Sequence, residues 1–383
     1  MKKVIALACL GAAAFVARCY LQKTMADVPT ELRRPFLPLT SGSFTPRMLP
    51  LWRAAFRLRM RPGPGVTVTE HHVAGDSAVR VLCHGTFPVP PNRPAVLWIH
   101  SGGMVVGSPQ FEAPTAGRLA RELGAVVVSP DYRLAPENPF PAALNDCMTT
   151  LRWMHERADE LGVDPTRIAV GGMSAGGGLA AAVAQRSYDE GLTLRAQVLV
   201  YPMLDDRTAL REDHAGRGQF VFTPEANRFG WTAYLGREPR MSDAPEYAAP
   251  ARREDISNLP TTWIGVGDLD ILYDESVEYA DRLKACGVPC ELVHSRRDVS
   301  RRGRPRPEGA LHAGVPPEFR EPPASAPLTR LPRPQHLQRF VGVRVHVDLT
   351  GDDLQHFSVG VDDERRPLHR HQLAEQAALH TER

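Results

Sequence analysis

The sequence predicts an α/β fold in which a mostly parallel sheet is covered by helices on both faces. The first observation is that strand-like and helix-like segments alternate between residues 95 and 294. The second is their spacing, which is typical of parallel strands joined by crossover helices. The third is a glycine-rich turn within residues 167–187 that joins an apolar run to a run of small residues.

Each predicted element follows from its local pattern. Short apolar runs predict strands, and they lie at 95–100, 125–133, 195–202, 261–270 and 288–294. Apolar residues at helical spacing predict helices, and they lie at 112–124, 141–162 and 276–287. Residues 167–187 are predicted to be a strand, a turn and a helix in succession. Gly124 is expected to end the first of these helices, because glycine is favoured just past a helix end.

The N-terminal 25 residues are expected to be a signal, a membrane anchor or a mis-assigned extension. Two lysines precede an apolar run over 4–17, which has the length of a signal-peptide core and is short for a spanning helix. Membrane contact through residues 1–17 is therefore one expectation, with an anchored or exported protein. The alternative is a cytoplasmic protein whose translation starts at Met25.

Two further regions do not follow the alternation: one precedes the core of residues 66–294, and the other is an insertion within it. Residues 26–65 have helical spacing, and prolines and glycines from Pro62 onward end the pattern. Residues 205–255 mix aromatic and charged residues and interrupt the alternation. They are interpreted either as a lid over the strand ends or as a surface excursion.

Composition narrows the function. The 383 residues carry a formal charge of only +2, so nothing points to nucleic acid. The six cysteines form no CxxC pair and no zinc-like spacing, so they are interpreted as buried or incidental thiols. No metal or cofactor is implied, and the oligomeric state is left open.

The strongest chemical motif is GGMSAGG at 171–177, which contains G-x-S-x-G centred on Ser174. It lies between an apolar strand and a small-residue helix, which is the context that such a nucleophile requires. Glycines allow a tight, strained turn, and the hydroxyl then projects above a helix N-terminus that favours developing negative charge. Ser174 is predicted to be a catalytic nucleophile.

A second motif, HSGGMVVGSP at 100–109, follows the strand at 95–100. Acyl transfer needs donors aimed at a tetrahedral oxyanion. The backbone N–H groups of Gly102 and Gly103 are predicted to supply two, and that of Ala175 a third. His100 precedes the nucleophile and closes a strand, so it is interpreted as a residue that organises this loop.

Together with DYRLAPENPFPAALND at 131–146, these motifs resemble the hormone-sensitive-lipase-like branch of the α/β-hydrolases, which includes bacterial carboxylesterases and acetyl-hydrolases. The resemblance runs from about Asp27 to His294. It implies an α/β-hydrolase fold with an N-terminal helical cap. It also implies that the YRLAPE segment braces the oxyanion loop rather than taking part in the chemistry.

The catalytic acid is expected after the nucleophile, in the order Ser, Asp, His. The segment DLDILYDE resembles the family's D-P-L-x-D-E, with Ile271 in place of the proline. The resemblance assigns the acid to Asp270, with Asp268 as the alternative. Asp274 and Glu275 are expected to face solvent or to cap the next helix.

The catalytic base is missing from its expected place. The resemblance puts a histidine in a short loop five to ten residues past the strand at 288–294, and residues 295–311 contain none. The weak candidates are His294, at the strand end, and His312, in an arginine- and proline-rich context.

One hypothesis is that the reading frame slips near 295–298. Codons permitted for residues 298–303, read one base later, give Thr-Tyr-His-Gly-Ala-Asp, which is the family's histidine loop. Residues 295–383 would then be an irregular, out-of-frame tail that lacks the final helix of the sheet's covering layer. The competing interpretation is a genuine, divergent extension, within which the alternating residues 341–349 predict a strand.

The sequence thus predicts a carboxylic ester hydrolase that forms an acyl-enzyme on small-molecule esters, with short-chain acyl groups as the default by resemblance. Its activity is in question because the base is missing. The alternatives are an impaired, binding-only hydrolase relative and a membrane-tethered interaction protein.

Overall fold

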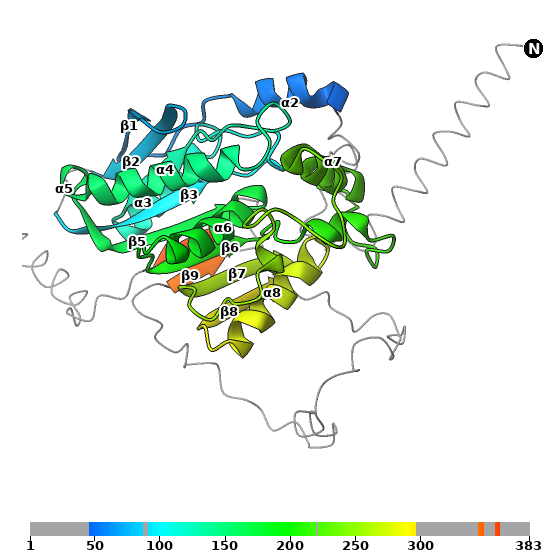
Figure 1. Ribbon diagram of the computed structural model, residues 1–383. Helices are drawn as coiled ribbons and strands as arrows, with labels where there is room; N and C mark the ends of the chain where they lie inside the picture. The colour runs from blue at the N-terminus through cyan, green and yellow to red at the C-terminus, as the bar shows by residue number, and fades with distance from the viewer. Residues whose placement is uncertain (1–45, 87–90, 220, 296–343, 348–356, 361–383) are drawn as a thin grey trace, which may run out of the picture. The chain divides into compact units, whose positions relative to one another are not determined.

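The computed structural model describes residues 46–86, 91–219, 221–295, 344–347 and 357–360. Eight strands form one sheet in the order β1-β2-β4-β3-β5-β6-β7-β8 (Figure 1). The strands are β1 (Val66–Val73), β2 (Val79–Thr86), β3 (Arg93–Ile99), β4 (Val126–Pro130), β5 (Val163–Met173), β6 (Ala196–Val200), β7 (Thr261–Gly267) and β8 (Cys290–Ser295).

Six of these strands are parallel, which confirms the predicted mostly parallel sheet. β1 pairs antiparallel with β2, and β2 pairs antiparallel with β4, whereas every pairing from β4 to β8 is parallel. The β1–β2 hairpin was not predicted from the sequence. β1 reads VTVTEHHV and is mostly exposed, so it lacks the apolar run that marks the inner strands.

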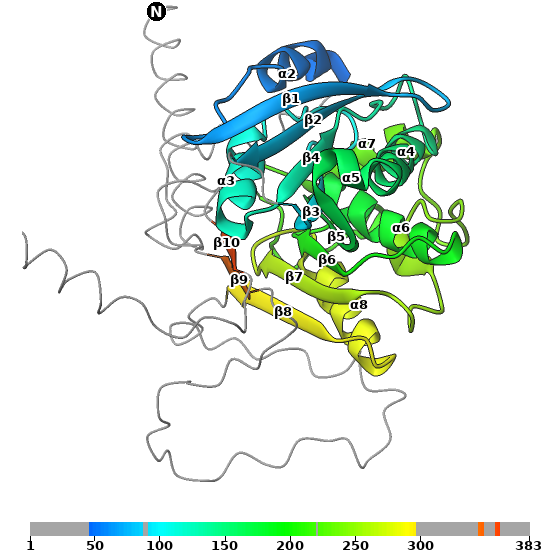
Figure 2. The same cartoon turned by 90° about the vertical axis from the view of Figure 1, so that its left-hand side faces the viewer.

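Helices cover both faces of the sheet, as expected. α3 (Ala113–Leu123) lies on one face, and α4 (Ala142–Glu156), α6 (Ala175–Asp189) and α8 (Tyr273–Ala285) lie on the other (Figure 2). Side chains alternate across each strand. In β3, Leu97 and Ile99 pack in the larger core cluster, whereas Val96 and Trp98 pack with α3.

Several predicted boundaries change, and the expected strand over 261–270, for example, ends at Gly267. The expected helix over 141–162 is two helices, α4 and the short α5 (Ala158–Leu161). The expected strand over 125–133 ends at Pro130, and the following residues form a loop. Gly124 ends α3 in a left-handed conformation with φ 59°, as the pattern predicts.

Before the sheet, η3 (Pro46–Met48) leads into α2 (Leu49–Phe56), which is the described part of the expected cap. The expected signal or anchor at residues 1–25 and the rest of the cap through residue 45 lie outside the described residues. Among the residues that are described, no helix is long and apolar enough to cross a membrane.

The region 205–255 contains η4 (Asp206–Leu210), α7 (Pro224–Leu235) and η5 (Pro250–Arg252). In the tail, β9 (Arg344–Val347) lies within the strand expected at 341–349, and its partner is β10 (Phe357–Gly360). The remainder of the tail at 295–383, including His312, lies outside the described residues.

Candidate active site

Ser174 lies on a strained turn between β5 and α6. Its backbone has φ 55° and ψ −119°, a conformation that residues other than glycine rarely adopt. The carbonyl of Ser174 accepts hydrogen bonds from the backbone N–H groups of Gly178 and Met203, both at 3.0 Å. The turn is therefore held from two sides, as a preorganised nucleophile requires.

The flanking glycines allow the backbone of this turn to contact its neighbours directly. A Cβ on Gly172 would lie 2.5 Å from the carbonyl oxygen of Gly176 and 2.6 Å from that of Ile99. A Cβ on Gly176 would lie 2.5 Å from the carbonyl oxygen of His100. The start of α6 is therefore in direct contact with the end of β3, where the HSGG loop begins.

The HSGG loop turns sharply at Gly102, whose φ is 125°. Its carbonyl accepts from the backbone N–H groups of Val105 and Val106, at 3.1 and 3.0 Å. A Cβ on Gly102 would overlap the carbonyl of Val106, so this position requires glycine.

No described residue accepts a hydrogen bond from the backbone N–H of Gly102, Gly103 or Ala175. Buried backbone donors without acceptors are rare in folded proteins and mark places where a ligand completes the bonding. Two of these donors follow β3 and the third follows Ser174, so all three come from the carboxyl ends of neighbouring parallel strands. This arrangement supports the predicted oxyanion hole.

The YRLAPE segment contacts the HSGG loop, as the resemblance implies. The Tyr132 hydroxyl donates to the carbonyl of His100 at 3.0 Å, and the two rings stack with centroids 4.0 Å apart. The backbone N–H of Ala135 donates to the carbonyl of Met104 at 2.9 Å. Arg133 in turn forms a forked ion pair with the buried carboxylate of Asp146.

His100 is buried and organises the loop, as expected. Its Nδ1 lies 2.8 Å from the carbonyl oxygen of Ser101, so Nδ1 carries the proton that is donated. Burial lowers the pKa of His100 to about 4, which keeps the ring neutral at pH 7.

Asp270 lies in the turn after β7, at the same end of the sheet as Ser174. Burial raises the pKa of this carboxyl to about 6, and the backbone N–H of Leu272 donates to it at 3.0 Å. Within the described residues, that N–H is its one hydrogen-bond donor. The alternative acid, Asp268, has its carbonyl bonded by Arg217 at 3.0 Å.

The expectation that Glu275 faces solvent or caps a helix is wrong. Its side chain is 2% exposed, and it accepts hydrogen bonds from the backbone N–H of Leu204 and from the hydroxyl of Thr208. The loop after β6 folds over the start of α8, and sequence spacing cannot show that approach. Asp274 is partly exposed and pairs with Arg211 and Arg217, which fits the expected solvent-facing position.

The side chains of the two candidate bases, His294 and His312, lie outside the part of the chain that the structure describes. The backbone of His294 lies in β8 opposite Val266 of β7. Gly267 pairs with Ser295 at the end of these strands, so the chain leaves β8 beside the turn that carries Asp270.

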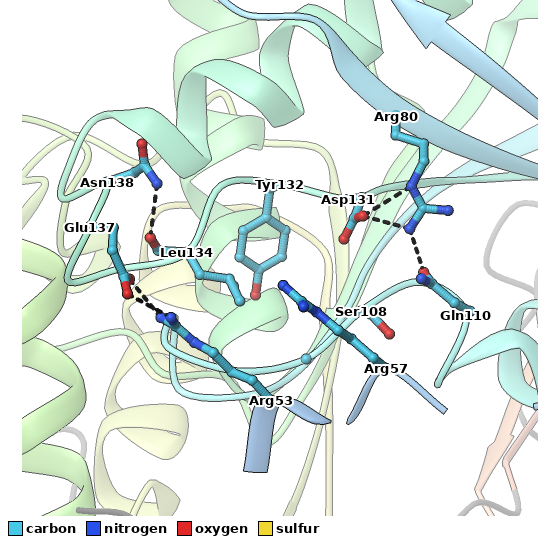
Figure 3. Close-up of a pocket in the computed structure, with 11 residues that line it drawn as sticks. Arg53, Arg57, Arg80, Ser108, Gln110, Asp131, Tyr132, Leu134, Glu137 and Asn138 are labelled. Atoms are coloured by element: carbon cyan, nitrogen blue, oxygen red, sulfur yellow. Dashed lines mark hydrogen bonds and ion pairs between the residues drawn. The ribbon is translucent and has the colours of Figure 1, made fainter. Parts of the chain in front are cut away.

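Arg53 connects α2 to both loops that build the site, although no sequence motif marks it. Its guanidinium donates to the carbonyl of Val105 at 2.9 Å and to that of Ala135 at 2.8 Å. It also forms a forked pair with Glu137, as Figure 3 shows. A cavity of about 730 Å³ lies beside this contact, but neither Ser174 nor Asp270 lines it.

The region 205–255 touches both sides of the site. A Cβ on Gly230 of α7 would lie 3.0 Å from the carbonyl oxygen of Gly103. The backbone N–H of Gly218 donates to the carbonyl of Leu269, next to Asp270, at 3.0 Å. Phe222 lies between these contacts, 3.4 Å from where a Cβ on Gly103 would be.

A parallel sheet that carries a serine on a strained strand-to-helix turn, next to unpaired backbone donors, defines the class of this protein as a hydrolase. A sequence model of the α/β-hydrolase fold matches residues 96–299. The chain belongs to this α/β-hydrolase family.

Several of the similar proteins are named as esterases. The chain is 37% identical over 226 residues to esterase LipI of Mycobacterium tuberculosis, covering 58% of this chain and 70% of that one. It is 36% identical over 240 residues to carboxylesterase NlhH of the same species, covering 60% and 73%. Among solved structures, a bacterial heroin esterase matches with a TM-score of 0.62 and 35% identity, covering 71% of this chain and 87% of that one.

Proposed function

We propose that this chain hydrolyses carboxylic esters of small molecules through an acyl-enzyme on Ser174. The observation that carries the proposal is the strained turn at Ser174 beside the unpaired N–H groups of Gly102, Gly103 and Ala175. The esterase names of relatives that share more than a third of their residues support the same reaction.

In the proposed reaction, the Ser174 oxygen attacks the acyl carbon and its proton passes to a base. The carbonyl oxygen becomes an oxyanion, and the three N–H groups donate to it. Collapse of this intermediate expels the alcohol, which takes the proton from the base. Water then attacks the acyl-enzyme by the same route and releases the acid.

Asp270 is proposed to hold the base in its correct tautomer and to stabilise it when it is protonated. The base itself is proposed to come from the segment that leaves β8 after Ser295, as a histidine restored by the alternative frame. His294 and His312 remain the candidates within the chain as written. Without a base in reach, serine is a weak nucleophile, so turnover is expected to be low.

Short-chain acyl esters are the proposed substrates, and residues 205–255 are proposed to form a lid. The support for the lid is that Phe222 and Gly230 pack on Gly103, within the proposed oxyanion hole. An aromatic side chain at this place narrows the space available to an acyl chain.

The test is release of p-nitrophenol from p-nitrophenyl acetate by the purified chain and by Ser174→Ala. We expect the wild type to exceed the variant, with both equally folded by circular dichroism. Equal rates at the background level would favour the alternative of a binding-only relative. A chain whose frame is restored after residue 295 should then be compared, and its rate is expected to be higher.

A further inference from the structure

We propose that Glu112 is a positioning residue for the oxyanion loop: its buried carboxylate holds Ser101, and through Ser101 it sets the direction of the Gly102 N–H. This inference rests on the proposed function, because it concerns the same oxyanion hole. Glu112 lies just before α3 and is 5% exposed, and no family motif quoted above includes it.

Three donors converge on this carboxylate. The backbone N–H of Ser101 donates to Oε1 at 2.7 Å, and the hydroxyl of Ser101 donates to the same oxygen at 2.6 Å. The indole Nε1–H of Trp98 donates to Oε2 at 3.0 Å. The backbone N–H and the indole N–H can only donate, and the Ser101 hydroxyl is able to donate. An ionised carboxylate accepts from all three at once.

The bonds fix the backbone on both sides of Ser101. Glu112 holds its N–H, and Nδ1 of His100 holds its carbonyl at 2.8 Å. The carbonyl of Ser101 and the N–H of Gly102 belong to one planar peptide and point in opposite directions. Holding the carbonyl toward His100 therefore turns the Gly102 N–H away from it, where no described residue accepts its hydrogen.

Ser101 and Glu112 work as a pair. Oxyanion loops in this class of hydrolase often read HGGG. In the HSGG sequence of this chain, Ser101 takes the place of the first glycine, and a glycine there would offer only a backbone N–H. A buried carboxylate is costly unless it receives several hydrogen bonds, and Ser101 gives two of the three. Burial raises the pKa of Glu112 even with these donors in place.

The first test measures loop order and needs no turnover. Glu112→Gln cannot satisfy all three donors, because its amide nitrogen would face either Trp98 or Ser101. We expect amide hydrogen exchange within residues 101–106 to accelerate by about 10-fold or more. Exchange in β5 should stay unchanged in Glu112→Gln. The control variant is Glu278→Gln, the same substitution at an exposed position, and its exchange within residues 101–106 should match that of the wild type. Unchanged exchange within 101–106 would overturn the proposal.

The second test measures catalysis wherever the wild type hydrolyses p-nitrophenyl acetate. Misdirected donors weaken transition-state binding more than substrate binding, so kcat should fall about 10- to 100-fold while KM changes little. A Glu112→Gln variant that exchanges faster yet keeps the wild-type kcat would sink the positioning role. If the wild type shows no hydrolysis, the proposed function fails. Hydrogen exchange alone then tests whether Glu112 orders the loop.

Ser101→Ala covers the case in which Glu112→Gln does not fold. It removes one donor and keeps the backbone N–H, so a smaller acceleration of exchange within 101–106 is expected. When both single variants fold, the acceleration of exchange within 101–106 in the double variant should be smaller than the two single effects combined, because both substitutions act on one hydrogen-bonded pair. Additive effects would show that the two residues act independently and would contradict the proposal.

Discussion

The carbonyl oxygen of Ile99 occupies the space that a side chain on Gly176 would need. This contact joins the last residue of β3 to the first turn of α6, so the two segments that supply the proposed oxyanion donors are in backbone contact. The turn that carries Ser174 and the proposed oxyanion loop are therefore in direct contact through the main chain.

Gly176→Ala should disrupt this contact. The added methyl would overlap the carbonyl of Ile99 and press on that of His100, which must move the HSGG loop away from Ser174. We expect the esterase rate to fall about 100-fold, as for a displacement of about 1 Å in a reacting group. Gly85→Ala is the matched control, because its Cβ would make only an ordinary contact with Arg93 at 3.6 Å. Equal rates in the two variants would contradict the argument.

Arg53→Ala should loosen α2 from the rest of the site. It removes hydrogen bonds to the carbonyls of Val105 and Ala135, and we expect it to lower the free energy of unfolding by about 1–3 kcal/mol. Urea unfolding measures the loss, and limited proteolysis within residues 46–60 locates it. Arg57 also lines the cavity in Figure 3, and its side chain has no hydrogen-bond or ion-pair partner among the described residues, so Arg57→Ala should behave as wild type.

Glu275 should make stability depend on pH. Burial raises its pKa from 4.5 to about 8 in the folded chain. Between these values the folded chain keeps a proton that the unfolded chain releases, so the free energy of unfolding falls as pH rises from about 4.5 to about 8. Urea unfolding at pH 5 and pH 8 should show a smaller difference for Glu275→Gln than for wild type. Glu278→Gln, which is exposed on the same helix, should keep the wild-type difference.

Asp270 should make activity depend on pH. The proposed role needs an ionised carboxylate, and the pKa of Asp270 is raised to about 6. The esterase rate should therefore rise with pH through about 6 and level off above it. Asp270→Asn should be slower at every pH and should lack this step. A step of the same size in Asp270→Asn would assign the titration to another group, with Asp268 tested next.

The nucleotide sequence of the gene tests the frame hypothesis directly. A His-Gly codon pair is expected in the alternative frame beneath residues 299–302. The family match ends at residue 299, close to the predicted slip at 295–298. If the alternative frame encodes no such pair, the genuine-extension interpretation is favoured, and His294 and His312 stay the candidates for the base beside the binding-only alternative.

The elements that depend on local sequence pattern were predicted correctly. The apolar runs within β3, β5, β6 and β7 lie in buried parts of the sheet. The G-x-S-x-G motif predicted the strained conformation of Ser174, because few other sequences permit that turn. The assignments of Ser174, Asp270 and the oxyanion donors remain predictions until variants are measured.

Contacts between distant segments could not be predicted. Glu275 is buried because a loop some seventy residues earlier folds over it, and no spacing within α8 indicates this. The link from Arg53 to Ala135 also joins segments far apart in sequence. β1 was missed because an exposed strand needs no apolar run.

The contacts of the 205–255 region bear on how such an enzyme could be modified. Gly230 packs on Gly103, and the backbone N–H of Gly218 donates to the carbonyl of Leu269, so one segment borders both the proposed oxyanion loop and the turn that carries Asp270. Exchanging this segment for that of a relative would alter the shape of the acyl site and the alignment of the reacting groups together. Selectivity and rate would then change in the same step, so engineering one while keeping the other calls for point substitutions at positions such as Phe222.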